Sequence, residues 1–174
     1  RQKKEAEQEI QQGKERKAAL QGLVTLLQEK LPLLRQGIDY KVFTELKGML
    51  LWPVRGRVVH EFGTRKHPKF NLKIENAGID IEAPPGTEVR AAADGWVMFS
   101  GDLPGYGALI MLHHGGKYFT IYTPVAANGL AEQQRIRQGQ VIGRVAASQI
   151  QGESVLHFEI RHEEESLNPQ DWLP

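Results

Sequence analysis

The sequence predicts an α+β protein in which α-helices precede a mainly antiparallel β domain. The composition changes sharply near residue 50: Gln, Glu, Lys and Leu dominate before it, and glycines and short β-branched runs follow it. Apolar residues at helical spacing favour helices, whereas short runs bounded by turn residues favour strands. We therefore expect a helical segment over residues 1–49 and a β domain over residues 50–174.

The first expected helix has a polar beginning and an apolar stripe. Residues 1–17 are almost wholly polar with mixed charge, which is typical of a solvated helix or of the end of a coiled coil. From Leu20 onward, apolar side chains recur at helical spacing. They are Leu20, Leu23, Val24, Leu27, Leu31 and Leu34. Pro32 is expected to kink or end this helix, because proline lacks an amide N–H and clashes with the preceding turn.

A second, shorter helix is expected after the first. Asp39 is a suitable N-cap, and Gly48 permits the left-handed conformation that often closes a helix. Between them, Val42, Phe43 and Leu46 fall on one side of the helix.

The β domain is predicted from seven short runs, many of them separated by glycine and proline clusters. The runs cover residues 57–62, 77–83, 95–100, 108–113, 118–122, 140–145 and 155–161. About 125 residues bury roughly two thirds of their unfolded surface, which is enough for an independent core. His113 and His114 precede Gly115 and Gly116 and are expected to be turn residues.

Alternation along three strands assigns two faces. Leu156, Phe158 and Ile160 are expected in the core, so that Val155, His157 and Glu159 point the other way. By the same reasoning Ile79 and Ile81 place Asp80 opposite the core, and Phe119 and Ile121 oppose Tyr118, Thr120 and Tyr122. If the less apolar faces line one groove, its neighbouring residues are Asn76, Asp80, Tyr122, Val155 and His157.

Composition excludes several classes of protein. The formal net charge of the 174 residues is +1, which gives no strong electrostatic case for nucleic acid or for an anionic membrane. No apolar run approaches the roughly 20 residues that span a bilayer. The chain has no cysteine, which excludes disulfides and thiolate metal sites. Because Arg1 is not a natural start, we expect a fragment, with whose missing part an export signal could have been lost.

An ordered set of motifs identifies a family. The motifs occupy residues 52–56, 62–68, 78–87, 93–95, 105–107, 139–143, 156–161 and 168–169. Residues 50–174 thereby closely resemble the LytM (lysostaphin-type) zinc endopeptidase domain, which cleaves peptidoglycan cross-links. The resemblance implies a lysostaphin-like fold with a duplicated hybrid motif.

The resemblance also assigns the catalytic positions, most of which are degenerate here. The family's first zinc-ligand histidine falls on Asn76, its aspartate ligand on Asp80, and its second histidine ligand on His157. Its two catalytic histidines fall on Pro124 and Val155. A hydrolytic zinc needs three protein ligands and an open position, and proline and valine cannot transfer protons. We therefore expect no bound metal, no other cofactor and no catalysis, and we expect Asp80 and His157 to be hydrogen-bonded structural residues.

The helical preface resembles the EnvC-like murein hydrolase activators. That resemblance implies a periplasmic protein whose degenerate LytM groove activates a cell-wall amidase (N-acetylmuramoyl-L-alanine amidase) during cell division. It also implies a coiled coil, missing here, that connects to a division complex resembling FtsE–FtsX, and a helix that blocks the groove. The candidate groove residues are Asn76, Asp80, Tyr106, Tyr122, Val155 and His157. The candidate regulatory residues are Leu23, Leu27, Leu31, Val42, Phe43 and Leu46.

Three alternatives remain open at the level of sequence. The helices could pack permanently on the β domain instead of inhibiting it. The domain could bind peptidoglycan without activating an amidase. It could also be an active zinc endopeptidase in which His67 replaces the histidine missing at Asn76. His60 and His162 have no partner that the sequence identifies.

Overall fold

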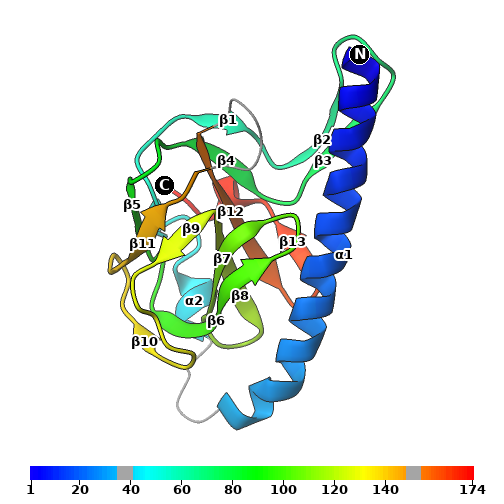
Figure 1. Cartoon of the computed structure of the whole chain (residues 1–174). Coiled ribbons are helices and arrows are strands. Elements are labelled where there is room, and N and C mark those ends of the chain that lie inside the picture. The colour runs from blue at the N-terminus through cyan, green and yellow to red at the C-terminus, as the bar shows by residue number, and fades with distance from the viewer. Residues whose placement is uncertain (35–40, 148–153) are drawn as a thin grey trace.

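The computed structural model describes residues 1–34, 41–147 and 154–174 as one long helix lying along a β domain (Figure 1). Helix α1 spans Gln2–Leu34 and helix α2 spans Lys41–Glu45. The strands of the main sheet are β1 (Val58–His60), β4 (Ile79–Glu82), β6 (Gly95–Leu103), β7 (Gly107–His113), β8 (Tyr118–Thr123), β10 (Arg135–Ile136), β12 (Val155–His162) and β13 (Glu165–Leu167). The remaining elements are β2 (Gly63–Lys66), β3 (Lys73–Asn76), β5 (Glu88–Arg90), β9 (Val125–Ala127), β11 (Val141–Val145) and the 3₁₀ turn η1 (Pro169–Asp171).

Antiparallel pairing organises all three sheets. The main sheet has the order β1-β4-β12-β8-β7-β6-β10, with β13 paired to β12. A second sheet has the order β5-β11-β9, and β2 and β3 form a separate hairpin. The predicted α+β class is therefore confirmed. Within the described residues, no helix combines the length and apolar character needed to cross a bilayer.

The main core lies on one face of the main sheet. Fully buried side chains from β7, β8 and β12, among them Leu112, Tyr122 and Phe158, pack there with Val89 and Ile142 of the second sheet. Such burial is the main favourable term in folding. The burial of every second side chain of β12 in this core determines that the side chains between them point to the opposite face of the sheet.

Helix α2 belongs to this core. Phe43 is 2% exposed and stacks on His114 and Trp172, with ring centroids 4.7 Å and 5.0 Å apart. Leu46 packs against the same cluster. Of the two helices proposed to cover a groove, α2 thus packs in the main core. The side chain of Val42, like that of Leu31, lies outside the described residues.

Helix α1 covers the opposite face of the main sheet, called here the α1 face. Leu20, Val24 and Leu27 are buried on it, and Leu23 is partly buried. They pack on residues of β6, β7 and β8, namely Met98, Leu109, Met111, Phe119 and Ile121. The helix continues through Pro32 to Leu34, so the expectation that Pro32 could end the helix is wrong.

Tyr122 corrects another expectation, because it faces the main core and not the α1 face. It is fully buried, and the Ala92 amide donates to its hydroxyl oxygen at 3.0 Å. The Thr120 hydroxyl lies 2.9 Å from the Tyr122 hydroxyl and 2.7 Å from Nε2 of His114. The phenol is therefore satisfied within the core, which explains why a tyrosine can lie there.

His113 and His114 are not exposed turn residues, since they are 4% and 3% exposed. Nδ1 of His114 donates to the Asp94 carbonyl at 2.6 Å. Burial lowers the pKa of each histidine to about 4, and the Asp94 carbonyl only partly offsets this for His114. Both histidines are therefore neutral at pH 7.

Candidate functional site

Strand β12 brings three polar side chains to the α1 face. Leu156, Phe158 and Ile160 occupy the core, so alternation turns His157, Glu159 and Arg161 the other way. Across the sheet, Asp80 of β4 is the register partner of His157. On the other side, Thr123 and Ile121 of β8 are partners of His157 and Glu159. Cross-strand partners share a face, so the polar residues adjoin the apolar surface under α1.

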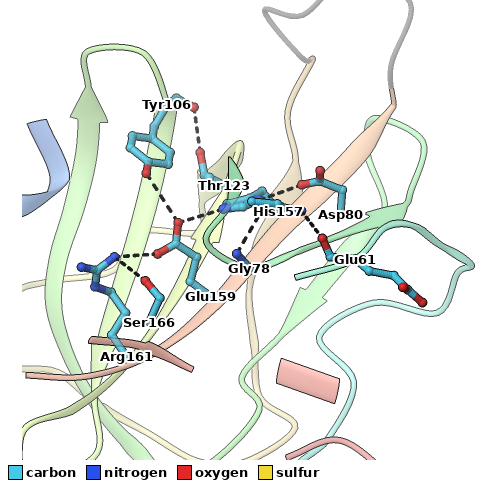
Figure 2. Close-up of polar contacts among 10 residues, drawn as sticks. Glu61, Gly78, Asp80, Tyr106, Thr123, His157, Glu159, Arg161 and Ser166 are labelled. Atoms are coloured by element: carbon cyan, nitrogen blue, oxygen red, sulfur yellow. Dashed lines mark hydrogen bonds and ion pairs between the residues drawn. The ribbon is translucent and has the colours of Figure 1, made fainter. Parts of the chain in front are cut away.

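These side chains form a continuous chain of charged contacts (Figure 2). Nδ1 of His157 lies 2.7 Å from Oδ1 of Asp80, and its Nε2 lies 2.8 Å from Oε1 of Glu159. Ionised carboxylates only accept hydrogen bonds, so both ring nitrogens of His157 act as donors. His157 is therefore an imidazolium held between two carboxylates.

The surroundings stabilise the charged forms of all three groups. For His157, burial lowers the pKa, but Asp80 and then Glu159 outweigh it and raise the pKa to about 10. For Asp80, burial raises the pKa, yet the charge and hydrogen bond of His157 bring it well below its usual range. The pKa of Glu159 is likewise lowered by His157 and Arg161 despite complete burial.

Arg161 completes the charge balance. It is 4% exposed, and Nη1 donates to Oε2 of Glu159 at 3.2 Å and to the Ser166 hydroxyl at 3.1 Å. Nη2 donates to the Glu164 carbonyl at 3.0 Å. Two carboxylates and two cations thus compensate each other, which is the condition under which buried charges are tolerated. The four residues Asp80, His157, Glu159 and Arg161 are called the charge quartet below.

His60 is attached to this quartet from β1. Its Nδ1 lies 3.0 Å from Oδ2 of Asp80, so that Asp80 contacts a histidine with each carboxylate oxygen. Sequence reasoning identified no partner for His60. The only signal available was its position in a predicted strand, and a single strand does not reveal which neighbour it pairs with.

Asn76 is occupied by a local structural role. Its carboxamide oxygen accepts from the Gly78 amide at 3.3 Å, and its Nδ2 donates to the Glu61 carbonyl at 3.2 Å. The first bond closes the turn between β3 and β4, and the second ties the end of β3 to the segment between β1 and β2. Val155 is 8% exposed at the start of β12, on the same side of the strand as His157.

Tyr106, a candidate groove residue from the sequence, lies beside Glu159 and His157. Its hydroxyl is 3.5 Å from Oε1 of Glu159, and its ring centroid is 6.3 Å from that of His157. The Thr123 hydroxyl donates to the Tyr106 carbonyl at 2.7 Å and holds the turn in place (Figure 2). Burial, followed by the charge of Glu159, raises the pKa of Tyr106, which keeps it neutral.

The residues at these positions do not fit a catalytic zinc. A zinc-bound imidazole must offer a lone pair, and both nitrogens of His157 are donors to carboxylates. The Asn76 carboxamide is engaged by Gly78 and Glu61. In residues 1–34, 41–147 and 154–174, no group of three or more His, Cys, Asp or Glu is placed to hold a metal ion.

His67, the substitute ligand considered above, is engaged elsewhere. It lies in the loop between β2 and β3, where its ring stacks on Phe70 at 4.9 Å. Its Nδ1 accepts from the Lys69 amide at 3.2 Å. Of the expected groove residues, the structure brings Asp80, Tyr106 and His157 into contact with one another and with His60, Glu159 and Arg161, while Tyr122 faces the main core. Asn76 contacts Glu61 and Gly78 instead, and Val155 shares the face of His157 on β12.

Helix α1 passes next to this site. Arg16 packs so closely on the β6–β7 turn that a Cβ added at Gly105, the neighbour of Tyr106, would lie 2.7 Å from its Cγ. The next residue, Lys17, reaches hairpin β2–β3, where its charged nitrogen lies 3.6 Å from a carboxylate oxygen of Glu75. The helix thus contacts both the hairpin and the turn that carries Tyr106.

Comparison with known proteins gives a consistent assignment. Residues 75–169 match Peptidase family M23. The chain is 36% identical over 127 residues to "Murein hydrolase activator EnvC" of Escherichia coli (strain K12), covering 73% of this chain and 29% of that protein. It is 38% identical over 132 residues to "DD-carboxypeptidase/endopeptidase Mpg" of Neisseria meningitidis serogroup B (strain MC58), covering 75% of this chain and 30% of that protein.

A solved structure gives the same picture for the fold. The structure of Helicobacter pylori Csd3 matches with a TM-score of 0.63 and 30% identity, covering 74% of this chain and 35% of that one. The chain thus spans only about a third or less of each of these proteins.

Proposed function

This chain belongs to peptidase family M23, and from that premise we propose that it activates a peptidoglycan amidase without hydrolysing the cell wall itself. One observation carries the proposal: His157, at a ligand position of the family, is fixed as an imidazolium between Asp80 and Glu159. An imidazolium offers no lone pair to zinc, and the family's two proton-transferring histidines are replaced here by Pro124 and Val155. The similarity to a relative named as a murein hydrolase activator supports the same direction.

The α1 face is suited to receive a helix from a partner. It offers apolar side chains from three strands and, beside them, the polar Tyr106 and the charge quartet. Helix-in-groove recognition uses this combination of an apolar surface with a few polar anchors. We propose that the amidase presents an amphipathic helix to this face.

In the structure α1 itself occupies the face, which supports self-inhibition. Burial of Leu20, Val24 and Leu27 contributes roughly 1.5–3 kcal/mol each, as an upper estimate. This is an amount that a tightly binding competitor or an external force can offset. We propose that residues 1–49 hold the regulatory helix, that residues 50–174 form the activating domain, and that a division complex resembling FtsE–FtsX displaces α1 in the periplasm.

A peptidase function is the second candidate, because a relative of similar identity is named as a DD-carboxypeptidase/endopeptidase. The contacts of both His157 ring nitrogens with carboxylates, and the hydrogen bonds of the Asn76 carboxamide, argue against a peptidase. Dialysis against zinc followed by metal analysis, together with a cross-linked peptide assay, separates the two functions. Stoichiometric zinc with turnover of the peptide would establish the peptidase.

The activator proposal can be tested by releasing and locking α1. Val24→Asp places a charge in the apolar contact and is expected to free the helix, whereas Leu26→Asp is a matched control at a position that is 64% exposed. The assay is release of dye-labelled peptidoglycan by a purified amidase. Val24→Asp should increase amidase activity, and Leu26→Asp should not.

A disulfide lock supplies the second arm. A Cβ at Gly105 would lie 3.8 Å from Cβ of Arg16, which matches disulfide geometry, and the chain contains no other cysteine. In the Val24→Asp background, oxidised Arg16→Cys/Gly105→Cys should lose activation and regain it on reduction. Because Gly105 has φ of +83°, the reduced form also serves as the control for strain. Equal activation by the oxidised and reduced forms would refute self-inhibition by α1.

A further inference from the structure

Hairpin β2–β3 carries a concentration of positive charge that lies outside the charge quartet. Residues 65–73 contain Arg65, Lys66, Lys69 and Lys73 and no carboxylate, although the whole chain has a net charge of only +1. The hairpin lies along the N-terminal half of α1 (Figure 1). Its charge is therefore placed where a helix bound to the α1 face would reach it.

Helix α1 contacts only two of these four cationic side chains. The carboxylate of Glu9 lies 3.2 Å from Arg65, and the amide oxygen of Gln2 accepts from Lys69 at 2.9 Å. The helix thus supplies one negative charge and one neutral acceptor to two of the four cations. It behaves as an incomplete ligand of the hairpin.

The other two cations, Lys66 and Lys73, lie directly across the hairpin from each other, and no carboxylate of the described residues pairs with them. Lys66 and Lys73 are register partners in the hairpin, and like charges directly opposite each other are destabilising. Both side chains are exposed, and neither makes an ion pair with another described residue. A ligand with additional carboxylates would remove this repulsion.

We propose that hairpin β2–β3 is a docking arm for an acidic segment of the partner protein, next to the apolar part of its helix. This inference rests on the proposed function, in which α1 leaves the face to a partner. A partner that brings several carboxylates satisfies Lys66 and Lys73 in addition to Arg65 and Lys69. It therefore gains contacts that α1 lacks, which favours exchange of one helix for the other.

The structure favours a protein ligand over an anionic membrane. The group already bound to the arm is a helix with an acidic residue, and that helix runs on from the hairpin to the apolar surface of β6–β8. A partner helix on the same path would contact both surfaces at once. Two linked contacts increase affinity beyond that of either one.

The first test uses the 174-residue chain and fluorescein-labelled decaglutamate as the probe, measured by fluorescence anisotropy at low ionic strength. Lys66→Glu/Lys73→Glu should weaken binding at least about tenfold, since it converts two attractions into repulsions. Arg55→Glu/Arg137→Glu is the matched control: both arginines are exposed, and it makes the same charge change away from the hairpin. It should change binding less than about twofold, and an equal loss in both variants would refute a specific arm.

The second test separates this proposal from the proposed function. In the Val24→Asp chain, binding of decaglutamate should tighten about three- to tenfold, because Arg65 and Lys69 are released from α1. If the amidase is activated but Lys66→Glu/Lys73→Glu leaves its affinity unchanged, the docking arm is refuted and the activator remains. If decaglutamate binds at the arm but no amidase is activated, the function fails and the arm stands. Binding of phosphatidylglycerol vesicles without decaglutamate would overturn the proposal in favour of a membrane contact.

Discussion

Replacing His157 by glutamine should destabilise the fold, because the imidazolium is the cation shared by two buried carboxylates. The pKa of His157 is raised from 6.5 to about 10, and one pKa unit corresponds to about 1.4 kcal/mol of preference for the charged form. The rise in the pKa of His157 therefore corresponds to a stabilisation of the folded state of about 5 kcal/mol, as an order of magnitude. Breaking a buried ion pair from one side costs a similar 3–5 kcal/mol, roughly.

The measurement is thermal denaturation followed by circular dichroism at pH 7. For a chain of 174 residues, about 2–4 °C per kcal/mol translates the loss into a fall of roughly 10 °C or more in melting temperature. The control is His162→Gln, a partly exposed histidine that stacks on Tyr118. It should change the melting temperature by about 2 °C or less.

The pH dependence adds a second criterion. The folded-state pKa of His157 is above its unfolded value, so its stabilisation is fully present below pH 6.5 and is lost as the pH rises through about 10. The difference between wild type and His157→Gln should therefore narrow between pH 7 and pH 10. A variant as stable as wild type at pH 7, or a difference that stays constant over this range, would refute the reasoning.

Three further predictions concern other parts of the molecule. The pKa values of His113 and His114 are lowered to about 4. Between pH 6.5 and pH 4 the unfolded chain therefore binds more protons than the folded chain, and the urea midpoint should fall as the pH is lowered through that interval. His114→Gln should reduce this dependence. Asn76→His alone should not create a zinc site, because zinc would have to displace a proton that His157 shares with Asp80 or Glu159. Calorimetric titration with zinc should show no stoichiometric binding, and tight binding would contradict the assignment. Leu20→Ala should loosen α1 by about 2–5 kcal/mol through the cavity it leaves, seen as faster amide exchange in residues 16–27, whereas Leu26→Ala should leave exchange nearly unchanged.

The strands with clear alternation could be predicted from the sequence, and those without it could not. Each of the seven predicted runs overlaps a strand of the structure. Strands β2 and β3 were missed because their residues, Gly63–Lys66 and Lys73–Asn76, are mostly exposed and polar. Strands β5, β9, β10 and β13 have only two or three residues, too few for a periodic signal.

The faces of β8 were assigned the wrong way round for a physical reason. Alternation separates Phe119 and Ile121 from Thr120 and Tyr122, but it does not say which pair faces the core. Because α1 covers the second face, both faces of β8 are buried, and polarity no longer distinguishes them. Tyr122 can enter the core because Ala92 and Thr120 satisfy its hydroxyl.

The site was predicted only in part, for a related reason. Ligand positions could be compared along the chain, which identified Asp80 and His157. Their partners Glu159, Arg161 and His60 become visible only when β12, β4 and β1 are paired. A pairing of distant strands is a tertiary fact that a single sequence does not contain.

The charge quartet has a consequence for what can disturb this part of the sheet. The positive charge beside Asp80 and Glu159 belongs to the covalently attached side chain of His157. It therefore stays in place at any ionic composition of the solvent, and it is removed only by substitution or by deprotonation. Each of the two carboxylates thus depends on a residue of its own strand or of the neighbouring strand.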